Sequence, residues 1–331
     1  MFEGKKILIT GGTGSLGTVL TKRLLQTNVE TIRIYSRDEL KQSQMESAFN
    51  DRRLRFLIGD IRDKERLSRA LEDIDIVIHA AALKIVPLIE YNPFEAIKTN
   101  VQGVQNLIEG CLDKNVEFAL AIGTDKAVSP FNTYGATKLL MERLFVSANY
   151  YKGSHKTKFS CVRYGNVMGS RGSVIPIFVE QIKSGKKVTI TDPEMTRFNI
   201  TMNQALDLIL RVLKNGYGGD VFVPKLKAYK VGDLKDVLCD LLDNKNGFET
   251  IPIRPGEKFH EILINEHEIR NTYESNDGDY VIYENPIIHQ LENGPYTNKT
   301  SLKSEYSSNK ADLLSKKELK DIIIKERLVT V

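Results

Sequence analysis

TGGTGSLG, residues Thr10–Gly17, stands between a short apolar run and a segment with the periodicity of a helix. In that context Gly11 permits a tight turn, Gly14 lets the backbone approach a diphosphate, and Gly17 lets the helix pack closely on the strand. The N-terminus of the helix adds unbonded N–H groups and partial positive charge. The stretch therefore predicts a dinucleotide cofactor bound where the first strand meets the first helix.

Outward from this stretch, short runs rich in β-branched residues alternate with segments of helical period, which is typical of a parallel sheet covered by helices on both faces. We expect strands at 6–10, 31–36, 55–60, 74–80, 116–124 and 158–164, and helices at 15–26, 64–71, 93–114 and 134–149. The fold class is therefore α/β. We expect a Rossmann-type doubly wound parallel sheet in residues 1–165, rejoined by later segments, and a smaller C-terminal α/β substrate-binding portion with a polar tail in residues 166–331.

The composition is that of an ordinary globular protein. The 331 residues include 47 Lys and Arg against 43 Asp and Glu, and the net charge of +4 is spread along the chain. Nucleic-acid binding needs clustered basic residues, so we expect no nucleic-acid partner. No segment approaches the roughly 20 apolar residues that span a bilayer, and three widely spaced cysteines indicate a reducing compartment. We expect a cytoplasmic protein without a membrane segment.

The second predicted strand ends in YSRDELK, where an NAD site usually has an acidic residue that binds the ribose 2′-hydroxyl. Here Ser36, Arg37 and Lys41 offer a hydroxyl and two cations to a 2′-phosphate, which favours NADP. The two acidic residues among them, Asp38 and Glu39, keep NAD as the alternative. The other positions expected to border the dinucleotide are Thr13, Ser15, Leu16, Asp60, Ile61 and Ala80.

Two residues at the start of the predicted helix 134–149 point to a reaction centre. Tyr134 and Lys138 are four residues apart and so lie on one helix face, where the ammonium can lower the phenol pKa and reach the nicotinamide ribose. Such a phenolate takes a proton from a substrate hydroxyl as hydride leaves for the cofactor. The same spacing recurs at Tyr306 and Lys310 in the polar tail. Tyr134 is favoured because it comes soon after the fifth predicted strand, downstream of a complete dinucleotide-binding half.

The segment GTDKAVSP, residues 123–130, begins where the fifth predicted strand ends. Ligands bind at the carboxyl ends of the strands in an open α/β sheet, so Thr124, Asp125 and Lys126 should point into the same crevice as Tyr134. An acid and a base side by side in this crevice suggest proton transfers beyond those of an oxidation.

Several motifs together carry a resemblance to a known family. TGGTGSLG, GDIRD, HAAALK, GTDKAVSP, YGATK, RYGNVMGSRGSVIP, DPEMTRF and RPGEKFHE resemble the extended short-chain dehydrogenase/reductase superfamily. Within it they are most similar to the inverting UDP-N-acetylglucosamine 4,6-dehydratases of the pseudaminic-acid pathway type. The resemblance runs from about Lys5 to Glu261.

This resemblance implies a lyase in which C4 of the sugar is oxidised, water is lost across C5 and C6, and hydride returns to C6. Tyr134 would take the C4 hydroxyl proton, Lys138 would hold the ribose, and Thr124 would bond the C4 oxygen. Lys126 would remove the C5 proton and return one to the other face, while Asp125 assists departure of the C6 hydroxyl. For this role we expect a desolvated crevice shared with other cations to lower the Lys126 pKa from about 10.4.

The resemblance also implies the substrate side of the site. Arginines suit the two charges of a diphosphate because a guanidinium binds phosphate oxygens in pairs. The residues expected at the UDP-sugar are Lys84, which would also reach the cofactor, and Asn166, Val167, Arg171, Arg197, Arg254, Glu257 and Tyr306.

Members of this group often form closed oligomers, so we expect a homo-oligomer. We expect no metal, because the histidines share no ligand spacing with cysteines or carboxylates. The alternatives are a nucleotide-sugar C4 epimerase, a dehydratase with added epimerase activity, a retaining dehydratase, and an NADP-binding regulator without turnover.

Overall fold

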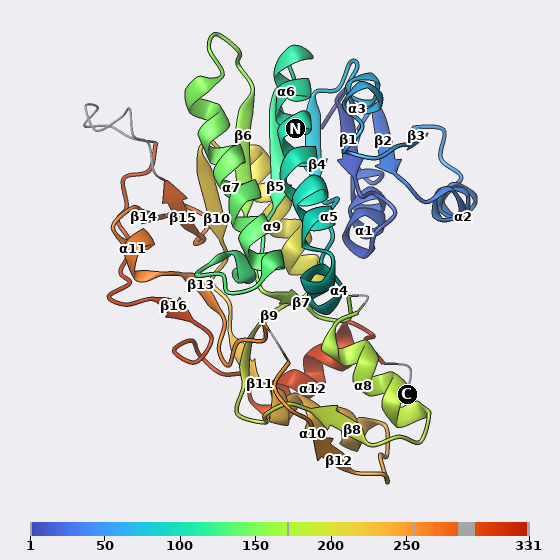
Figure 1. Ribbon diagram of the computed structural model, residues 1–331, viewed down its shortest axis with the longest axis vertical. Coiled ribbons are helices and arrows are strands. Elements are labelled where there is room, and N and C mark those ends of the chain that lie inside the picture. Colours follow the sequence, from blue (N-terminus) through green and yellow to red (C-terminus); the bar gives the residue numbers. More distant parts are fainter. Residues whose placement is uncertain (1, 171, 255, 284–294, 330–331) are drawn as a thin grey trace.

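The computed structural model describes residues 2–170, 172–254, 256–283 and 295–329. Figure 1 shows a wide sheet covered by helices in the upper body of the molecule and a smaller portion below it. Within the described residues the large sheet has nine strands. From one edge to the other they are β14 (Thr272–Glu274), β15 (Tyr280–Tyr283), β10 (Asp220–Val223), β6 (Lys158–Val162), β5 (Phe118–Ile122), β4 (Ile76–His79), β1 (Lys6–Thr10), β2 (Thr31–Ser36) and β3 (Leu54–Ile58).

The strand order confirms the doubly wound Rossmann-type fold. The strands from β3 to β10 run parallel, with the order 3-2-1-4-5-6 that places a crevice at the carboxyl ends of β1 and β4. The sheet is not wholly parallel, however, because β15 pairs antiparallel with both β10 and β14. Strands from beyond residue 165 thus extend the sheet formed by the first half of the chain.

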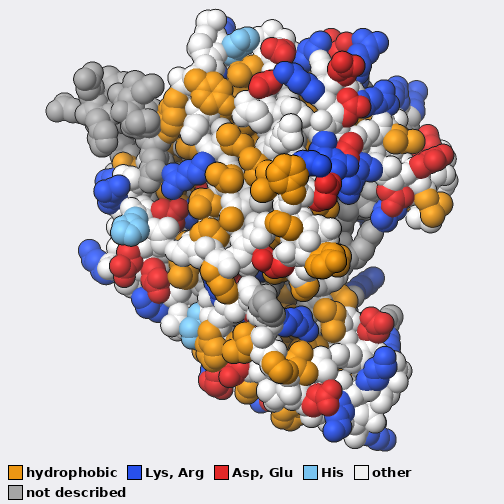
Figure 2. All heavy atoms as spheres, viewed as in Figure 1, with side chains coloured by type: hydrophobic (Ala, Val, Ile, Leu, Met, Phe, Trp, Pro, Cys, Tyr) orange, Lys and Arg blue, Asp and Glu red, His pale blue; other side chains and the backbone are white. Residues whose placement is uncertain are grey.

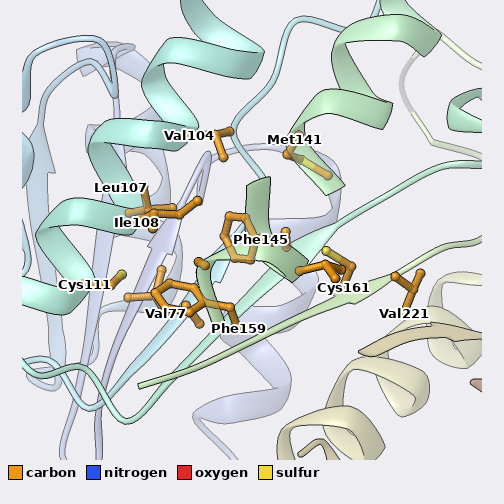
Figure 3. Close-up of a cluster of buried hydrophobic side chains, with 14 of the residues drawn as sticks. Val77, Val104, Leu107, Ile108, Cys111, Met141, Phe145, Phe159, Cys161 and Val221 are labelled. Atoms are coloured by element: carbon orange, nitrogen blue, oxygen red, sulfur yellow. The ribbon is translucent and has the colours of Figure 1, made fainter. Parts of the chain in front are cut away.

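Side chains that alternate along the strands feed two cores, one on each face of the sheet. In β1, Leu8 packs into one core while Ile7 and Ile9 pack into the other, and all three are fully buried. The first core is drawn in Figure 3, where Phe145 of one helix lies over Phe159 of β6.

Helices cover both of these cores. The first core is covered by α3 (Lys64–Ala70), α6 (Gly103–Asp113) and α7 (Thr133–Tyr151), and the second by α1 (Ser15–Leu24), α2 (Glu39–Phe49) and α9 (Met202–Asn215).

Two helical features differ from the sequence-based expectation. The helix α2 was not expected; it begins at the N-cap Asp38 and buries only Gln42 and Met45, so its apolar period is weak. The single helix expected at 93–114 is divided, because α5 (Pro93–Ile97) and α6 are joined by the π-helical turn η1 (Lys98–Gln102). A π turn is a single-turn bulge within a helix that otherwise continues, so α5, η1 and α6 together span nearly the single helical segment that was expected.

The lower portion has its own core, formed mainly by three helices: α8 (Val174–Lys183), α10 (Val231–Leu241) and α12 (Lys316–Lys325). The remaining elements are short. They are α4 (Val86–Tyr91), η2 (Asp125–Ala127), β7 (Asn166–Val167), β8 (Val188–Ile190), β9 (Thr196–Ile200), β11 (Ala228–Lys230), β12 (Phe248–Thr250), β13 (Ile262–Ile264), α11 (Glu266–Ile269) and β16 (Tyr306–Ser307).

A buried ion cluster ties the late chain to the upper body. Arg163, after β6, bonds both carboxylate oxygens of Glu142 on α7 and of Glu268 on α11.

Among the helices that the structure describes, none has the length and apolar character needed to cross a membrane.

Candidate active site

The glycine-rich loop after β1 is shaped to leave room above the backbone. Gly11 has a φ of +67°, and a Cβ there would lie 2.8 Å from the backbone nitrogen of Ala81. A Cβ at Gly17 would lie 2.4 Å from the carbonyl oxygen of Gly12, so only glycine lets α1 start so close to the loop. Gly14 is the N-cap of α1 and provides no side-chain hydrogen bond to the first turn. The cradle therefore fits a dinucleotide diphosphate, which would bind the first-turn amides.

The residues around this cradle hold it to the neighbouring strands. Thr13 donates a hydrogen bond to the hydroxyl of Ser36 over 3.2 Å, which joins the loop to the end of β2. Ser15 begins α1, and Leu16 packs on the second core. Ala80, directly after β4, donates its amide to the carbonyl oxygen of Thr10.

The end of β2 holds the charges expected to select the cofactor. Lys41 pairs with Asp38 at 2.5 Å, whereas Arg37 is 57% exposed and lies 3.8 Å from Asp60. Asp60 is bonded more closely by Arg62. Arg37 therefore keeps more freedom to meet a phosphate than Lys41 does. Ile61, expected at the adenine, is a buried core residue against α6.

The crevice beyond β5 contains a buried group of charges. Asp125 is fully buried, and one of its oxygens accepts hydrogen bonds from the Thr124 hydroxyl at 2.9 Å and the Lys126 ammonium at 3.1 Å. The same ammonium donates to the side-chain oxygen of Asn166 in β7 at 2.9 Å. It also lies 3.7 Å from a carboxylate oxygen of Glu261, a residue that is 3% exposed.

The charge state of Lys126 differs from the expected one. We expected other cations and burial to lower its pKa. Burial does act in that direction, but the charges of Asp125 and Glu261 outweigh it and raise the pKa above its ordinary value. The expectation of a lowered pKa is therefore wrong for this arrangement, because the nearest neighbours are carboxylates. Without substrate, Lys126 is an ammonium.

Tyr134 and Lys138 lie on the first turns of α7, both buried. Burial raises the pKa of the Tyr134 phenol, while the charge of Lys126 and a hydrogen bond with Thr124 act to lower it. We expected Lys138 to be the cation that lowers this pKa, but the cation that does so is Lys126. Lys138 instead donates to the carbonyl oxygen of Ile122 at 2.6 Å, and burial lowers its own pKa to about 8.

Three residues expected at the sugar nucleotide lie in β9 and in the loop that follows β12. Arg197 in β9 is buried; it donates to two backbone carbonyl oxygens and lies 3.5 Å from Glu257 and 3.9 Å from Glu261. Arg254 is exposed, at the start of the loop that carries Glu257. This loop is held against the crevice, since Asn132 donates to the carbonyl oxygen of Gly256.

The remaining expected residues lie in the loop before α4, in β7 and in β16. Lys84 is exposed in the loop between β4 and α4, and Val167 is half-buried in β7. Tyr306 directs its hydroxyl to the backbone of Leu226, with bonds of 2.6 and 2.8 Å, rather than to Lys126. Arg171 lies outside the described residues.

Comparisons with known proteins place this site in a family. A family model described as "Polysaccharide biosynthesis protein" matches residues 7–283. The chain belongs to the polysaccharide biosynthesis protein family. A relative from Campylobacter jejuni (strain 81-176), named UDP-N-acetylglucosamine 4,6-dehydratase (inverting), is 51% identical and covers 83% of this chain and 81% of its own. A relative from Rickettsia massiliae, named UDP-glucose 4-epimerase, is 39% identical over 98% of this chain and 96% of its own. The solved structure of Pen from Bacillus thuringiensis is 39% identical, with a TM-score of 0.93 over all of both chains.

Two residues in this member of the polysaccharide biosynthesis protein family were missed from the sequence. Glu261 is the last residue of RPGEKFHE, so the motif held the signal, but its distance from Lys126 along the chain hid their contact. Asn100 lies in the π turn η1 and is 1% exposed. It bonds both the backbone N–H and the carbonyl oxygen of Leu83 at 2.9 Å, which fixes the loop that carries Lys84.

The histidines of this family member bear on whether the site could hold a metal ion. Across the residues that the structure describes, no three His, Cys, Asp or Glu side chains are grouped to hold a metal ion. His79, at the end of β4, bonds the Thr10 hydroxyl at 2.7 Å. Burial and the charge of Lys138 lower its pKa to about 3, so it is a neutral part of the core beneath the cofactor cradle.

Proposed function

We propose that this chain is a UDP-N-acetylglucosamine 4,6-dehydratase that inverts C5 of the sugar. The observation that carries the proposal is the buried group of Asp125, Lys126 and Glu261 beside Tyr134. Oxidation at C4 needs one base, whereas loss of water across C5 and C6 needs further groups that move protons. The 51% identity to the Campylobacter jejuni enzyme of that name supports the same function.

The cofactor of this reaction is a dinucleotide, and we infer NADP. The glycine cradle would hold its diphosphate, with Ser36, Arg37 and Lys41 at the 2′-phosphate. NAD is the alternative, kept open by the acidic Asp38 and Glu39 in the same segment. When bound, the nicotinamide supplies the site that accepts hydride from C4 and returns it to C6. Lys138 is expected to bind the adjoining ribose.

The side chains of the crevice handle the protons. Tyr134 accepts the C4 hydroxyl proton, and Thr124 donates a hydrogen bond to the C4 oxygen. Lys126 removes the C5 proton and returns one to the opposite face, while Asp125 assists the departing C6 hydroxyl. The departing hydroxide needs one proton, and the C4 hydroxyl releases one. The side chains of the crevice therefore have to hold the proton of the C4 hydroxyl until the C6 hydroxide departs.

The substrate is proposed to lie against the part of the crevice that faces the lower portion. The upper and lower portions meet in a notch on the right of Figure 2. Basic side chains there suit the diphosphate, and Asn166 would contact the sugar beside Lys126. The proposed contacts are Lys84, Asn166, Val167, Arg171, Arg197, Arg254 and Glu257.

A C4 epimerase is the second candidate, because the Rickettsia massiliae relative carries that name. Incubation with NADP and UDP-N-acetylglucosamine, followed by mass spectrometry, separates the two. We expect the product to be lighter by one water. A product of unchanged mass would support the epimerase and contradict the dehydratase.

We also propose that the chain forms a homo-oligomer. Phe94 on α5 and Leu140 on α7 are 64% and 50% exposed, and Figure 2 shows hydrophobic side chains on the face that these helices cover. An exposed apolar surface of this kind marks a protein contact.

A further inference from the structure

Glu261 lies beside Lys126 and Arg197, and none of the proton transfers proposed above uses it. Its Oε1 is 3.7 Å from the Lys126 ammonium and 3.9 Å from the Nε of Arg197. Its Oε2 is buried and, among the described residues, has no hydrogen-bond partner. A buried carboxylate oxygen without a donor is costly, and protonation or a bound ligand removes that cost.

Lys126 needs a proton acceptor before it can act as a base. Its ammonium is held by two carboxylates, so it has no lone pair to remove the C5 proton. Asp125 is the nearer carboxylate, and its Oδ2, like Oε2 of Glu261, is buried without a hydrogen-bond partner among the described residues. Asp125, however, already has the role of assisting departure of the C6 hydroxyl in the proposed reaction. Glu261 accepts no hydrogen bond from Lys126 at 3.7 Å. A shift of about 1 Å in the flexible lysine side chain would make one.

We propose that Glu261 is the proton partner of Lys126 in the proposed dehydration, accepting one ammonium proton so that the neutral amine can remove the C5 proton. The N–H bond of Lys126 breaks and an O–H bond forms on Glu261, so an ion pair becomes a neutral amine and a carboxylic acid. Substrate that excludes water from the crevice favours this change, because burial penalises the charged pair more than the neutral one. Burial already raises the pKa of Glu261.

The charges around the pair set its response to pH. The groups that face Lys126 or Glu261 are Asp125, Tyr134, Arg197, Tyr229 and Lys258. With Glu261 present, the proton moves within the site, so the rate of C5 deprotonation is flat between pH 7 and 9. With glutamine there, Lys126 has to lose its proton to solvent, so that rate rises with pH.

Glu261 acts through Lys126, so it is a positioning residue. The test therefore measures C4 oxidation, dehydration and C5 hydrogen exchange separately. Glu261→Gln is mixed with NADP and UDP-N-acetylglucosamine, recording reduced nicotinamide at 340 nm, product mass, and exchange of the C5 hydrogen in deuterated water. At pH 7 we expect reduced nicotinamide to accumulate while dehydration and C5 exchange fall by about 100-fold. Both rates should recover by about tenfold per pH unit toward pH 9, because the fraction of neutral Lys126 amine rises tenfold for each tenfold fall in proton concentration.

Two further variants keep the test decisive. Glu261→Asp retains a carboxylate and should keep the flat pH profile at a reduced rate, which a purely structural role would not require. Glu268→Gln is the matched control, because Glu268 is also buried but pairs with Arg163 away from the crevice. It should lower stability without accumulation of reduced nicotinamide.

The outcomes separate this inference from the proposed function on which it rests. If wild-type protein fails to dehydrate the substrate, the proposed function is contradicted. If wild-type protein dehydrates the substrate and the dehydration rate of Glu261→Gln at pH 7 is within about threefold of the wild-type rate, the role of Glu261 is contradicted. Equal loss of C4 oxidation and dehydration in Glu261→Gln, or a pH profile like that of Glu261→Asp, would also overturn it.

Discussion

At Lys126 an ammonium lies between two buried carboxylates and an amide oxygen, at the edge of the crevice that contains Tyr134. We predict that Lys126→Ala lowers dehydration by at least about 100-fold, because the group that moves the C5 proton is gone. Dinucleotide binding should stay within about twofold, since the cradle is formed by other residues. Product mass and a fluorescence titration with NADPH measure the two effects. Lys227→Ala, an exposed lysine paired with Glu318, is the control. Retained dehydration would remove Lys126 from the mechanism.

Arg37 is the cation best placed to choose between the two cofactors, since Lys41 is engaged by Asp38. We predict that Arg37→Asp shifts the preference from NADP toward NAD by about tenfold or more, as the acidic side chain repels a phosphate and binds a ribose hydroxyl. Dissociation constants for both cofactors test this. An unchanged ratio would show that the phosphate lies elsewhere.

Lys138 is a buried charge whose cost depends on pH. Its folded pKa of about 8 is below the value of about 10.4 for an unfolded chain. Between these values the unfolded chain binds more protons, so stability rises with pH, and below about pH 8 the cost is complete. In the cofactor-free protein, Lys138→Met should raise the free energy of unfolding at pH 7 by about 2 kcal/mol, after the lost bond to Ile122 is subtracted. Denaturant titrations should show no gain near pH 11. A less stable variant at pH 7 would contradict the burial argument.

Among the elements, the π turn η1 places Asn100 where its side chain bonds the backbone of Leu83 in the loop before α4. Asn100→Ala would leave the N–H and carbonyl of Leu83 without these partners. We predict a loss of about 2–3 kcal/mol in the free energy of unfolding and weaker binding of UDP-sugar through Lys84. Thermal unfolding measures the loss of stability, and a titration with UDP-sugar measures the weaker binding. Gln105→Ala, on the half-exposed side of α6, should change little. A loss as large there would show that the effect does not come from the contacts of Asn100 with Leu83.

The strands could be predicted closely, whereas the contacts within the site could not. The alternation in β1 and β2 reports burial on a sheet, and the expected bounds of these two strands match the structure. In contrast, α2 buries only two residues, so its period is too weak to reveal it. Lys126 and Glu261 meet only because β13 brings the end of RPGEKFHE against η2, and no local pattern encodes that packing. For the same reason the sign of the Lys126 pKa shift was wrong.

At the scale of the whole molecule, the apolar face over α5 and α7 should be covered by another copy of the chain. We predict that Leu140→Glu combined with Phe94→Glu reduces the oligomer to smaller species, because charges would be buried at the contact. Sedimentation velocity measures the size. The doubly substituted control Lys245→Glu and Lys214→Glu, on exposed sites elsewhere, should leave it unchanged. A wild-type protein that sediments as a monomer at micromolar concentration would contradict the proposal.

The most direct measurement is an NMR spectrum of the product made from UDP-N-acetylglucosamine in deuterated water. The proposed chemistry requires a 4-keto-6-deoxy sugar with inverted configuration at C5 and deuterium there, because an amine in the crevice removes one hydrogen and returns another. A product that keeps its C6 hydroxyl and its original hydrogen at C5 would contradict that chemistry.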